Sequence, residues 1–317
     1  MKTIVTGVNG QLGYDLVFRL LSDGNTVIGT DLVPADIVLK DPEEAAKYRF
    51  RVLDITDKEE VLKLIGEERP DAVIHCAAWT AVDAAEDEDK KEKVFAVNVS
   101  GTGYLAEACR AAGARMVYIS TDYVFNGKGS RPWDPDSKEF EPLNEYGRTK
   151  LEGERRVASL LERFYIVRTS WVFGIHGNNF VKTMLRVGRN REQVTVVCDQ
   201  IGTPTYTKDL ADLIAEMIRT EKYGYYHASN SECRPGEYIS WADFTEEVYR
   251  QAGYATTVKR VTTEEYGLSK AARPENSRLD KTKLARNGFA PLPDWKDALH
   301  RYLIELDMEK NNGTDQS

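Results

Sequence analysis

The sequence predicts an α/β fold in which helices cover both faces of a parallel sheet, and three observations lead to this prediction. Apolar runs of strand length alternate with helical periods through the first two thirds of the chain. The runs are apolar at successive positions rather than at every second one, as in strands buried on both faces. A glycine-rich turn over residues 7–13 follows the first strand and leads into the first helix. We therefore expect a Rossmann-type, doubly wound parallel sheet with a smaller, interleaved C-terminal α/β lobe.

The first half of the chain supplies the regular alternation. The expected elements, in chain order, are strand 2–7, a helix from 11, strands 26–31 and 50–54, helix 57–68, strand 71–78, helix 88–112 and strand 115–121. Residues 34–49 lengthen the connection between the second and third strands, and we expect them to form a surface insertion.

The second half begins in the same way and then breaks into shorter pieces between prolines. The expected elements are helix 144–163, strand 164–171, helix 178–189, strand 193–197, helix 207–219, strand 224–229, a helix from 240, strand 259–261 and a last helix over 294–308. We expect a dinucleotide-binding domain over 1–175, to which parts of the later chain return. A mainly substrate-binding lobe follows over 176–308, and a polar, frayed tail over 309–317.

Composition excludes several classes of protein. The 317 residues carry a formal charge of -8, which gives no bulk attraction to nucleic acid or to an anionic membrane. No apolar run reaches the roughly 20 residues of a membrane span, and the N-terminus lacks a signal-peptide layout, so we expect a cytoplasmic protein. The four cysteines are widely scattered, which predicts buried small hydrophobic residues rather than a disulfide framework or a zinc site.

The glycines at 7, 10 and 13 predict a dinucleotide site. After a strand and before a helix, such glycines make the tight turn, let a pyrophosphate approach the main chain and pack the helix against the sheet. The helix N-terminus adds free N–H groups and a positive dipole end. Asp31 closes the second strand, where a carboxylate accepts both ribose hydroxyls of NAD and repels a 2'-phosphate. We expect NADH or NADPH, with NADH favoured; the alternative is an ordinary turn beside a solvated aspartate.

A tyrosine and a lysine stand four residues apart in EYGRTK, so Tyr146 and Lys150 project from one face of the expected helix. A nearby ammonium favours the phenolate and is expected to lower the pKa of the tyrosine, which makes the phenol a proton shuttle. Upstream, Ser120 and Thr121 end a parallel strand, at the edge where open α/β sheets bind ligands. A hydroxyl there can stabilise a carbonyl oxygen that gains negative charge. A surface Tyr/Lys pair and a strand-capping hydroxyl are the structural alternatives.

With these motifs in place, the sequence resembles the dTDP-4-dehydrorhamnose reductase family of the extended short-chain dehydrogenase/reductase superfamily. The resemblance runs from Lys2 to about Leu303. It is carried by TGVNGQLG, AAWTAVDAAE, STDYVFNGKG, NEYGRTKLEGE, TSWVFG, QIGTPTYTKDLA and RPENSRLD.

The resemblance implies a set of cofactor-binding residues. The pyrophosphate loop would consist of Gly7, Gly10, Gln11, Leu12 and Gly13. The adenosine end of the cofactor would contact Asp31, Asp54 and Ile55, and the wall of the cofactor cleft would be formed by Ala77 and Ala78. Asn98 would hold a water or a backbone group near the lysine, unless it is an ordinary exposed helix residue. Cys76 stands where the family usually has asparagine, which is a departure from its pattern.

The implied reaction is NAD(P)H-dependent reduction of the C4 ketone of dTDP-4-dehydro-L-rhamnose. Tyr146 would donate a proton to the ketone oxygen, Thr121 would hydrogen-bond that oxygen, and Lys150 would hold Tyr146 and the nicotinamide ribose. The substrate would meet Trp171 as a wall, with Asn179 and Arg273 at its nucleotide end. A core tryptophan and a surface ion pair are the alternatives for Trp171 and Arg273.

The resemblance also bears on metal and assembly. Some family members dimerise through Mg²⁺ bound by acidic side chains, and Asp15 falls near one such ligand. We predict no metal site, no nucleic-acid or membrane partner, and either a monomer or a homodimer.

Two other functions fit the same sequence. One is another extended short-chain nucleotide-sugar enzyme, a reductase or a 4-epimerase; a dehydratase is disfavoured because Asp122 and Tyr123, rather than an Asp-Glu pair, follow the strand-end threonine. The other is a non-catalytic subunit similar to the regulatory subunit of methionine adenosyltransferase. The intact Thr121, Tyr146 and Lys150 argue against that second alternative.

Overall fold

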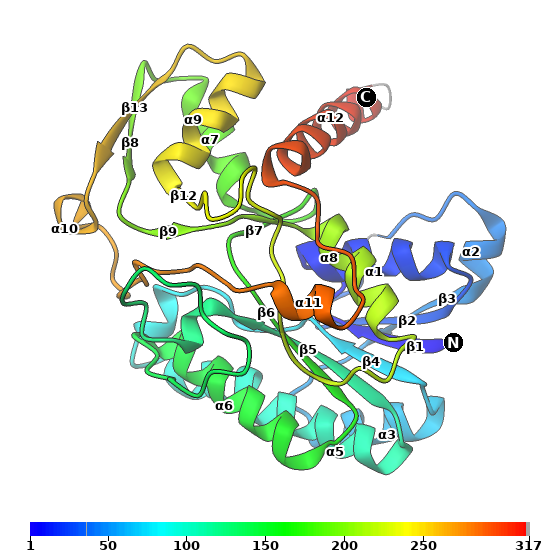
Figure 1. Cartoon of the computed structure of the whole chain (residues 1–317). Coiled ribbons are helices and arrows are strands. Elements are labelled where there is room, and N and C mark those ends of the chain that lie inside the picture. Colours follow the sequence, from blue (N-terminus) through cyan, green and yellow to red (C-terminus); the bar gives the residue numbers. More distant parts are fainter. Residues whose placement is uncertain (36, 315–317) are drawn as a thin grey trace.

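A seven-stranded, all-parallel sheet forms the centre of the molecule in the computed structural model, which describes residues 1–35 and 37–314 (Figure 1). The strand order is β11-β6-β5-β4-β1-β2-β3. The strands are β1 (Lys2–Thr6), β2 (Thr26–Asp31), β3 (Tyr48–Val52), β4 (Ala72–His75), β5 (Arg115–Thr121), β6 (Phe164–Thr169) and β11 (Gly224–His227). The strand order reverses between β1 and β4, and open α/β sheets bind ligands at such a switch point. The expected doubly wound α/β fold is confirmed.

Helices cover both faces of the sheet and make two separate hydrophobic layers. One layer contains α1 (Gln11–Ser22), α8 (Thr207–Met217) and α11 (Thr282–Arg286). The other contains α3 (Lys58–Glu68), α5 (Thr102–Ala112) and α6 (Glu145–Leu160). Central strands such as β4 are buried at every position, which explains why they read as continuous apolar runs.

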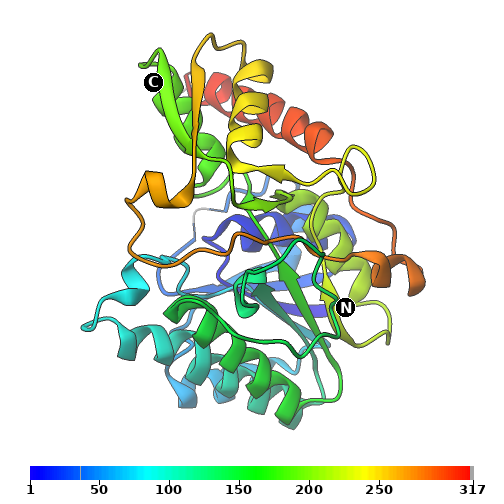
Figure 2. The ribbon, with the colours of Figure 1, turned by 60° about the vertical axis from the view of Figure 1, so that its left-hand side comes forward.

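The later chain builds a smaller lobe above the sheet (Figure 2). It contains α7 (Phe180–Gly188), α9 (Trp241–Ala252), α12 (Trp295–Thr314) and the parallel pair β8 (Gln193–Val197) and β13 (Thr257–Val261). Two short pairs connect it to the sheet, β7 (Val172–Phe173) with β10 (Thr205–Tyr206) and β9 (Ile201–Gly202) with β12 (Ile239–Ser240). Because α8, β11 and α11 pack with the large sheet, the chain crosses between the two parts several times, as expected for an interleaved lobe.

Four segments differ from the sequence-based expectation. The insertion over 34–49 contains α2 (Pro42–Lys47), whose N-cap Asp41 accepts bonds from the amides of Glu43 and Glu44. The single helix expected over 88–112 is α4 (Lys91–Phe95), a π-helical turn (Ala96–Gly101) and α5. The last helix continues to Thr314, beyond the expected start of a frayed tail at 309. A short helix α10 (Thr263–Tyr266) was also not expected. Such short pieces depend on local caps rather than on hydrophobic period.

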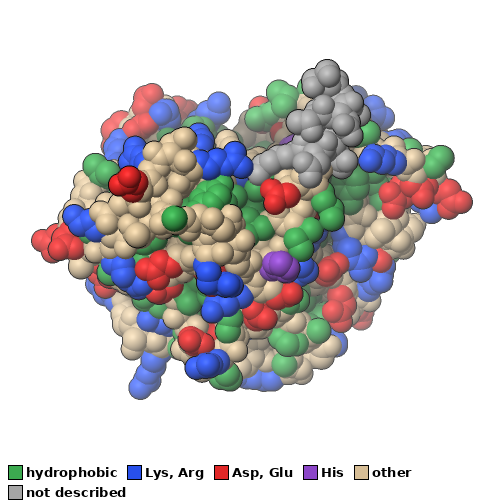
Figure 3. Space-filling view, turned by 90° about the horizontal axis from the view of Figure 1, so that it is seen from above, with side chains coloured by type: hydrophobic (Ala, Val, Ile, Leu, Met, Phe, Trp, Pro, Cys, Tyr) green, Lys and Arg blue, Asp and Glu red, His purple; other side chains and the backbone are tan. Residues whose placement is uncertain are grey.

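Basic and acidic side chains are interspersed over the face of the molecule seen in Figure 3. This mixture agrees with the absence of a bulk field of one sign. Among the described residues, we find no helix with the length and apolar character needed to cross a bilayer.

A buried ion pair fastens α6 to the sheet. Arg168, at the end of β6, donates through Nε and Nη2 to both carboxylate oxygens of Glu154 on α6, at 2.8 and 2.7 Å. Neither side chain is more than 2% exposed. Ser120 also donates to Glu154, and the guanidinium donates to the carbonyl oxygen of Pro135. The pair therefore links β5, β6, α6 and the loop around 135.

Replacement of Glu154 by glutamine leaves the Arg168 guanidinium buried without a counter-charge. We expect the free energy of unfolding to fall by about 3 to 5 kcal/mol, the usual cost of removing one partner of a buried pair. Urea denaturation followed by circular dichroism measures it. The matched control is Glu152→Gln on the same helix, whose partner Arg155 is 57% exposed and whose loss should cost less than about 1 kcal/mol. Equal effects of the two variants would contradict the prediction.

Candidate active site

The glycine turn after β1 is shaped by close backbone contacts. Gly7 has a φ of +74°, and a β-carbon on it would stand 2.7 Å from the amide nitrogen of Ala77. The amide of Gly10 donates to the carbonyl of Gly7 at 3.0 Å, and Gly13 packs directly over that same carbonyl. Only glycine meets these constraints at position 7. The turn and the end of β4 therefore lie in contact at the switch point of the sheet.

Helix α1 presents free amides at this turn. Its N-cap, Gly10, provides no side-chain hydrogen bond, and its first turn carries no acidic residue. By contrast, side chains of Asp57, Asn144 and Ser240 cap α3, α6 and α9. Uncapped amides with the positive dipole end behind them fit a pyrophosphate. Gln11 and the buried Leu12 begin the helix at this place.

Asp31 stands where the sequence predicts the adenosine ribose. Its carboxylate accepts hydrogen bonds from the amides of Asn9 at 2.9 Å and Leu32 at 2.8 Å. These bonds hold it beside the glycine turn, at the carboxyl end of β2. Asp54, after β3, forms a local turn with Thr56 at 2.8 Å, and Ile55 is buried against Gly101 of the π-helical turn. The expected adenosine-binding residues therefore lie along one edge of the sheet.

Asn98 is buried, and its amide connects the cleft wall to the catalytic helix. Its Oδ1 accepts from the amide of Trp79 at 2.8 Å, and its Nδ2 donates to Thr149 on α6 at 3.0 Å. The exposed-helix alternative does not hold, because Asn98 is 1% exposed. Trp79 follows Ala77 and Ala78, so Asn98 fixes the segment expected to line the cofactor cleft. Its position within the π-helical turn is typical of functional sites.

Helix α6 begins at a doubly capped end, which fixes the position of Tyr146. The side chain of Asn144 accepts from the amide of Gly147 at 2.8 Å, and the carboxylate of Glu86 accepts from the amide of Glu145 at 2.7 Å. Gly147 lies against the carbonyl oxygen of Tyr123, at a distance that leaves no room for a side chain. The phenol of Tyr146 is therefore held beside the end of β5.

A chain of hydroxyl groups leads from Tyr146 into the protein. The phenol of Tyr146 is hydrogen-bonded to the side chain of Thr121, and the Thr121 hydroxyl donates to Oδ1 of Asp122 at 3.1 Å. Asp122 is 2% exposed, and burial raises the pKa of its carboxyl to about 6 although the hydroxyls of Ser277 and Thr121 oppose the shift. The site thus contains three connected groups that can each hold or pass a proton.

Lys150 lies one turn further along α6, 3% exposed, with Nζ 4.1 Å from the centroid of the Tyr118 ring. Burial lowers the pKa of Lys150 to about 7, while the charges of Glu154 and Cys76 oppose this shift. Cys76 immediately precedes Ala77, so the ammonium is near the mouth of the glycine turn rather than in open solvent. Tyr146, Lys150 and the glycine turn are brought together as the sequence predicts.

The expectation that Lys150 lowers the pKa of Tyr146 is wrong for this structure. Burial raises the pKa of Tyr146, and the interaction with the Thr121 side chain only partly offsets this rise. A pKa well above neutrality keeps the phenol protonated. A protonated phenol is the form that can act as a general acid toward a ketone.

The three expected substrate residues have different surroundings. Trp171 is partly exposed beyond the end of β6. Asn179 caps α7 and donates to Gln11, to the carbonyl of Gly174 and to the hydroxyl of Tyr302, which gives it a structural role rather than a free amide for the nucleotide. Arg273 forms a two-bond ion pair with Asp83 at 2.7 and 3.0 Å, the ion-pair alternative considered for it.

Sequence reasoning passed over two residues at this site. Asp122 was considered only as a residue that disfavours a dehydratase. Its place directly after Thr121 nevertheless puts a carboxylate next to the Thr121 hydroxyl. Ser277, in the segment RPENSRLD, lies close enough to Asp122 to influence the pKa of its carboxyl, although it stands 155 positions further along the chain. No local pattern in the sequence predicts that contact.

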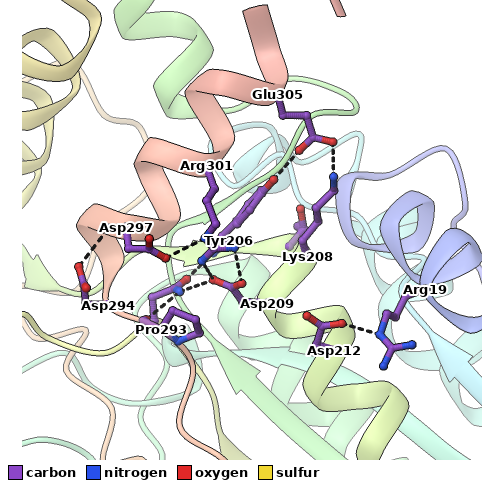
Figure 4. Close-up of polar contacts among 12 residues, drawn as sticks. Arg19, Tyr206, Lys208, Asp209, Asp212, Pro293, Asp294, Asp297, Arg301 and Glu305 are labelled. Carbon is purple, nitrogen blue, oxygen red and sulfur yellow. Dashed lines mark hydrogen bonds and ion pairs between the residues drawn. The ribbon is translucent and has the colours of Figure 1, made fainter. Parts of the chain in front are cut away.

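The acidic residues near Asp15 do not fit a divalent metal ion. A groove between α1, α8 and α12 lies beside Asp15, and several acidic residues in or next to it have cationic partners (Figure 4). Arg301 donates to both oxygens of Asp209 at 2.8 Å, Glu305 pairs with Lys208 and Tyr206, and Asp212 pairs with Arg19. Within the described part of the chain, no group of three His, Cys, Asp or Glu side chains could hold a metal. Asp209, Glu305 and Asp212 are thus already paired with cationic side chains of the same chain.

The fold and the site together define a nicotinamide-dependent oxidoreductase of the short-chain dehydrogenase/reductase class, because a bare phosphate turn faces a Tyr–Lys pair across the switch point. A family model described as "RmlD substrate binding domain" matches residues 1–308. The chain belongs to this family.

Individual relatives agree with that assignment. A dTDP-4-dehydrorhamnose reductase of Streptomyces griseus is 42% identical over 94% of this chain and 91% of its own length. The spore coat polysaccharide biosynthesis protein SpsK of Bacillus subtilis is 37% identical over 96% and 97%. The crystal structure of dTDP-4-dehydrorhamnose reductase from Bacillus anthracis in complex with NADP has a TM-score of 0.81 and 39% identity, and covers 96% of this chain and 99% of that one.

The raised pKa of Asp122 predicts a stability that depends on pH. Its folded-state pKa of about 6 lies above the ordinary 3.8, so the protonated carboxyl favours folding. This contribution to the free energy of unfolding amounts to at most about 3 kcal/mol. It is fully present below about pH 4 and is lost as the pH rises through about 6. Urea denaturation at several pH values should show wild type losing stability relative to Asp122→Asn over that window. The exposed Asp89→Asn serves as control, and parallel curves for wild type and Asp122→Asn would contradict the assignment.

The groove predicts indifference to divalent metal. EDTA and millimolar MgCl₂ should give the same melting temperature and the same mass by light scattering, because Arg301 and Lys208 already neutralise Asp209 and Glu305. A rise in melting temperature or a change of mass on addition of Mg²⁺ would show that these carboxylates bind the ion.

Proposed function

We propose that this protein uses NAD(P)H to reduce the C4 ketone of dTDP-4-dehydro-L-rhamnose, giving dTDP-L-rhamnose, and that it acts in the cytoplasm. The observation that carries the proposal is the hydrogen-bonded chain Tyr146–Thr121–Asp122 beside Lys150 and the glycine turn. Family membership and relatives named dTDP-4-dehydrorhamnose reductase support this choice of substrate.

The residues of the site divide the work in the following way. When bound, the reduced nicotinamide supplies the hydride. Tyr146 donates its phenolic proton to the ketone oxygen as that oxygen gains charge, and Thr121 hydrogen-bonds the same oxygen. Lys150 orients Tyr146 and the nicotinamide ribose. In the structure the Thr121 hydroxyl donates to the buried carboxyl of Asp122, whose pKa is about 6, and Thr121 exchanges this bond for one to the ketone oxygen when the substrate binds.

Asp31 governs the choice between the two cofactors in this proposal. Its carboxylate is held by two backbone amides, so it cannot easily turn away from a 2'-phosphate. We therefore propose that NADH is preferred and that NADPH is accepted, in line with the NADP complex of the Bacillus anthracis relative. Gly7, Gly10, Gln11, Leu12, Gly13, Asp54, Ile55, Ala77, Ala78 and Asn98 complete the proposed cofactor site.

Replacement of Tyr146 by phenylalanine should remove the proton donor and leave the cofactor contacts intact. We expect turnover to fall by about 10²- to 10⁴-fold while the dissociation constant for NADH stays within twofold, because general acid assistance is typically of that size. The assay follows NADH and NADPH oxidation with enzymatically prepared dTDP-4-dehydro-L-rhamnose, and NMR identifies the C4 configuration of the product.

Tyr104→Phe, on α5 and beside Lys58, is the matched control and should keep wild-type turnover. Retained turnover in Tyr146→Phe would overturn the assigned role. NAD that copurifies with the protein, together with interconversion of C4 epimers, would favour the epimerase alternative. Absence of turnover with every dTDP-4-keto sugar, with copurification of a larger enzyme, would favour the regulatory-subunit alternative.

A further inference from the structure

Trp171 has a backbone conformation that is unusual for its residue type. Its φ is +50°, one of two positive values among the described non-glycine residues, and a large aromatic side chain rarely adopts this left-handed region. Such conformations persist only where the surroundings hold them, and they concentrate at functional sites. The question is which contacts hold this one.

Hydrogen bonds from the segment 203–205 fix the backbone on both sides of Trp171. The amide of Thr205 donates to the carbonyl of Trp171 at 3.1 Å, and the Thr205 hydroxyl donates to the carbonyl of Ser170 at 2.7 Å. The Ser170 hydroxyl in turn donates to the carbonyl of Thr203 at 2.8 Å. These bonds fix the direction in which the Trp171 side chain points away from the backbone, but they do not fix the plane of its indole ring.

The indole plane is fixed by Trp241 and Gly202. The rings of Trp171 and Trp241 stack with centroids 3.9 Å apart and planes 18° from parallel. Gly202 provides a second contact, because a β-carbon there would stand 3.2 Å from two carbons of the Trp171 six-membered ring. Trp171 is therefore packed against a bare backbone and against one other aromatic ring.

Trp241 is itself held rigidly. It is the first residue of α9, directly after Ser240, whose side chain and Asp243 form a reciprocal capping box at 3.1 and 2.7 Å. Phe180, the first residue of α7, contacts Trp241 with centroids 4.4 Å apart. A capped helix start with an aromatic neighbour gives Trp241 little freedom to tilt.

The place of Trp171 in the sheet puts it at the catalytic edge. Thr121 and Thr169 are register partners on β5 and β6, and Trp171 follows Thr169 by two residues. Gly202, against which Trp171 packs, also faces the β-carbon of Ser277, and Ser277 lies close enough to Asp122 to influence the pKa of its carboxyl. Gly202 and Ser277 therefore link Trp171 to the group of Tyr146, Thr121 and Asp122.

We propose that Trp241 is a positioning residue for the nucleotide sugar: it fixes the plane of the Trp171 indole, which then presents a rigid edge to the sugar ring. Trp241 acts through Trp171 and does not touch the substrate. The inference rests on the proposed function, since it assigns Trp171 to the sugar side of that site. It explains why a strained tryptophan is kept at the strand end instead of an unstrained small residue.

The test combines kinetics with a spectroscopic signature of the stack. Stacked indoles give an exciton couplet in far-ultraviolet circular dichroism, and Trp241→Leu should abolish it. We expect the KM for dTDP-4-dehydro-L-rhamnose to rise about tenfold, with the KM for NADH and the melting temperature nearly unchanged, because an aromatic pair of this kind contributes a factor of about that size. Trp241→Phe should restore most of the lost affinity for the sugar nucleotide.

Trp295→Phe is the matched control, because Trp295 lies in the same lobe and contacts Phe244. It should keep both the couplet and the KM. Loss of the couplet in Trp241→Leu with an unchanged sugar-nucleotide KM would overturn the inference alone, and so would an equal rise of both KM values. If wild type itself does not reduce the sugar nucleotide, the proposed function fails and the inference fails with it. If Trp241→Leu does not fold, an unchanged sugar-nucleotide KM in Phe180→Leu would overturn the inference, and a rise of that KM alone would support it.

Discussion

The contact between Gly7 and the backbone of Ala77 is the constraint on which the site depends. No β-carbon fits between them, so the ends of β1 and β4 approach more closely than two ordinary residues would allow. That approach places the uncapped start of α1 next to the segment that Asn98 ties to the catalytic helix. The phosphate turn and the Tyr–Lys pair come from opposite sides of the switch point, and this contact brings them to one edge of the sheet.

Burial sets the resting protonation of the site. It raises the pKa of the Tyr146 phenol and lowers that of the Lys150 ammonium to about 7, so the resting site holds its proton on the tyrosine. The sequence pattern Y-x-x-x-K does not predict this, because it sets the spacing of the two side chains and not the depth at which they are buried.

The sequence allowed the sheet, its main helices and the proximity of Thr121, Tyr146 and Lys150 to the glycine turn to be predicted, because each depends on local signals. Buried parallel strands are apolar at successive positions, the glycine turn has a fixed spacing, and Tyr146 and Lys150 share a helix face. Asn179 and Arg273 were assigned to the substrate from the family resemblance, and their partners in the structure could not be predicted because Gln11 and Asp83 lie more than 150 residues away in the chain. The roles of Ser277 and Trp241 likewise depend on contacts with residues that are distant in the sequence, and no local pattern encodes such contacts. The short helices of the insertion and of residues 263–266 depend on single caps and were missed for that reason.

The buried guanidinium of Arg168 has a consequence for how the cleft can move. Phe125, Phe140 and Tyr225 surround it, each ring centroid 5.0 to 5.1 Å from the Cζ atom, and the carbonyl of Pro135 completes its coordination. If the loop over 125–140 swung outward, it would remove two of these rings and one acceptor and expose an ion pair that has almost no water contact. The loop over 125–140 is therefore held in place on this side of the cleft. The motions that admit and release ligands then fall to segments that have no such anchor.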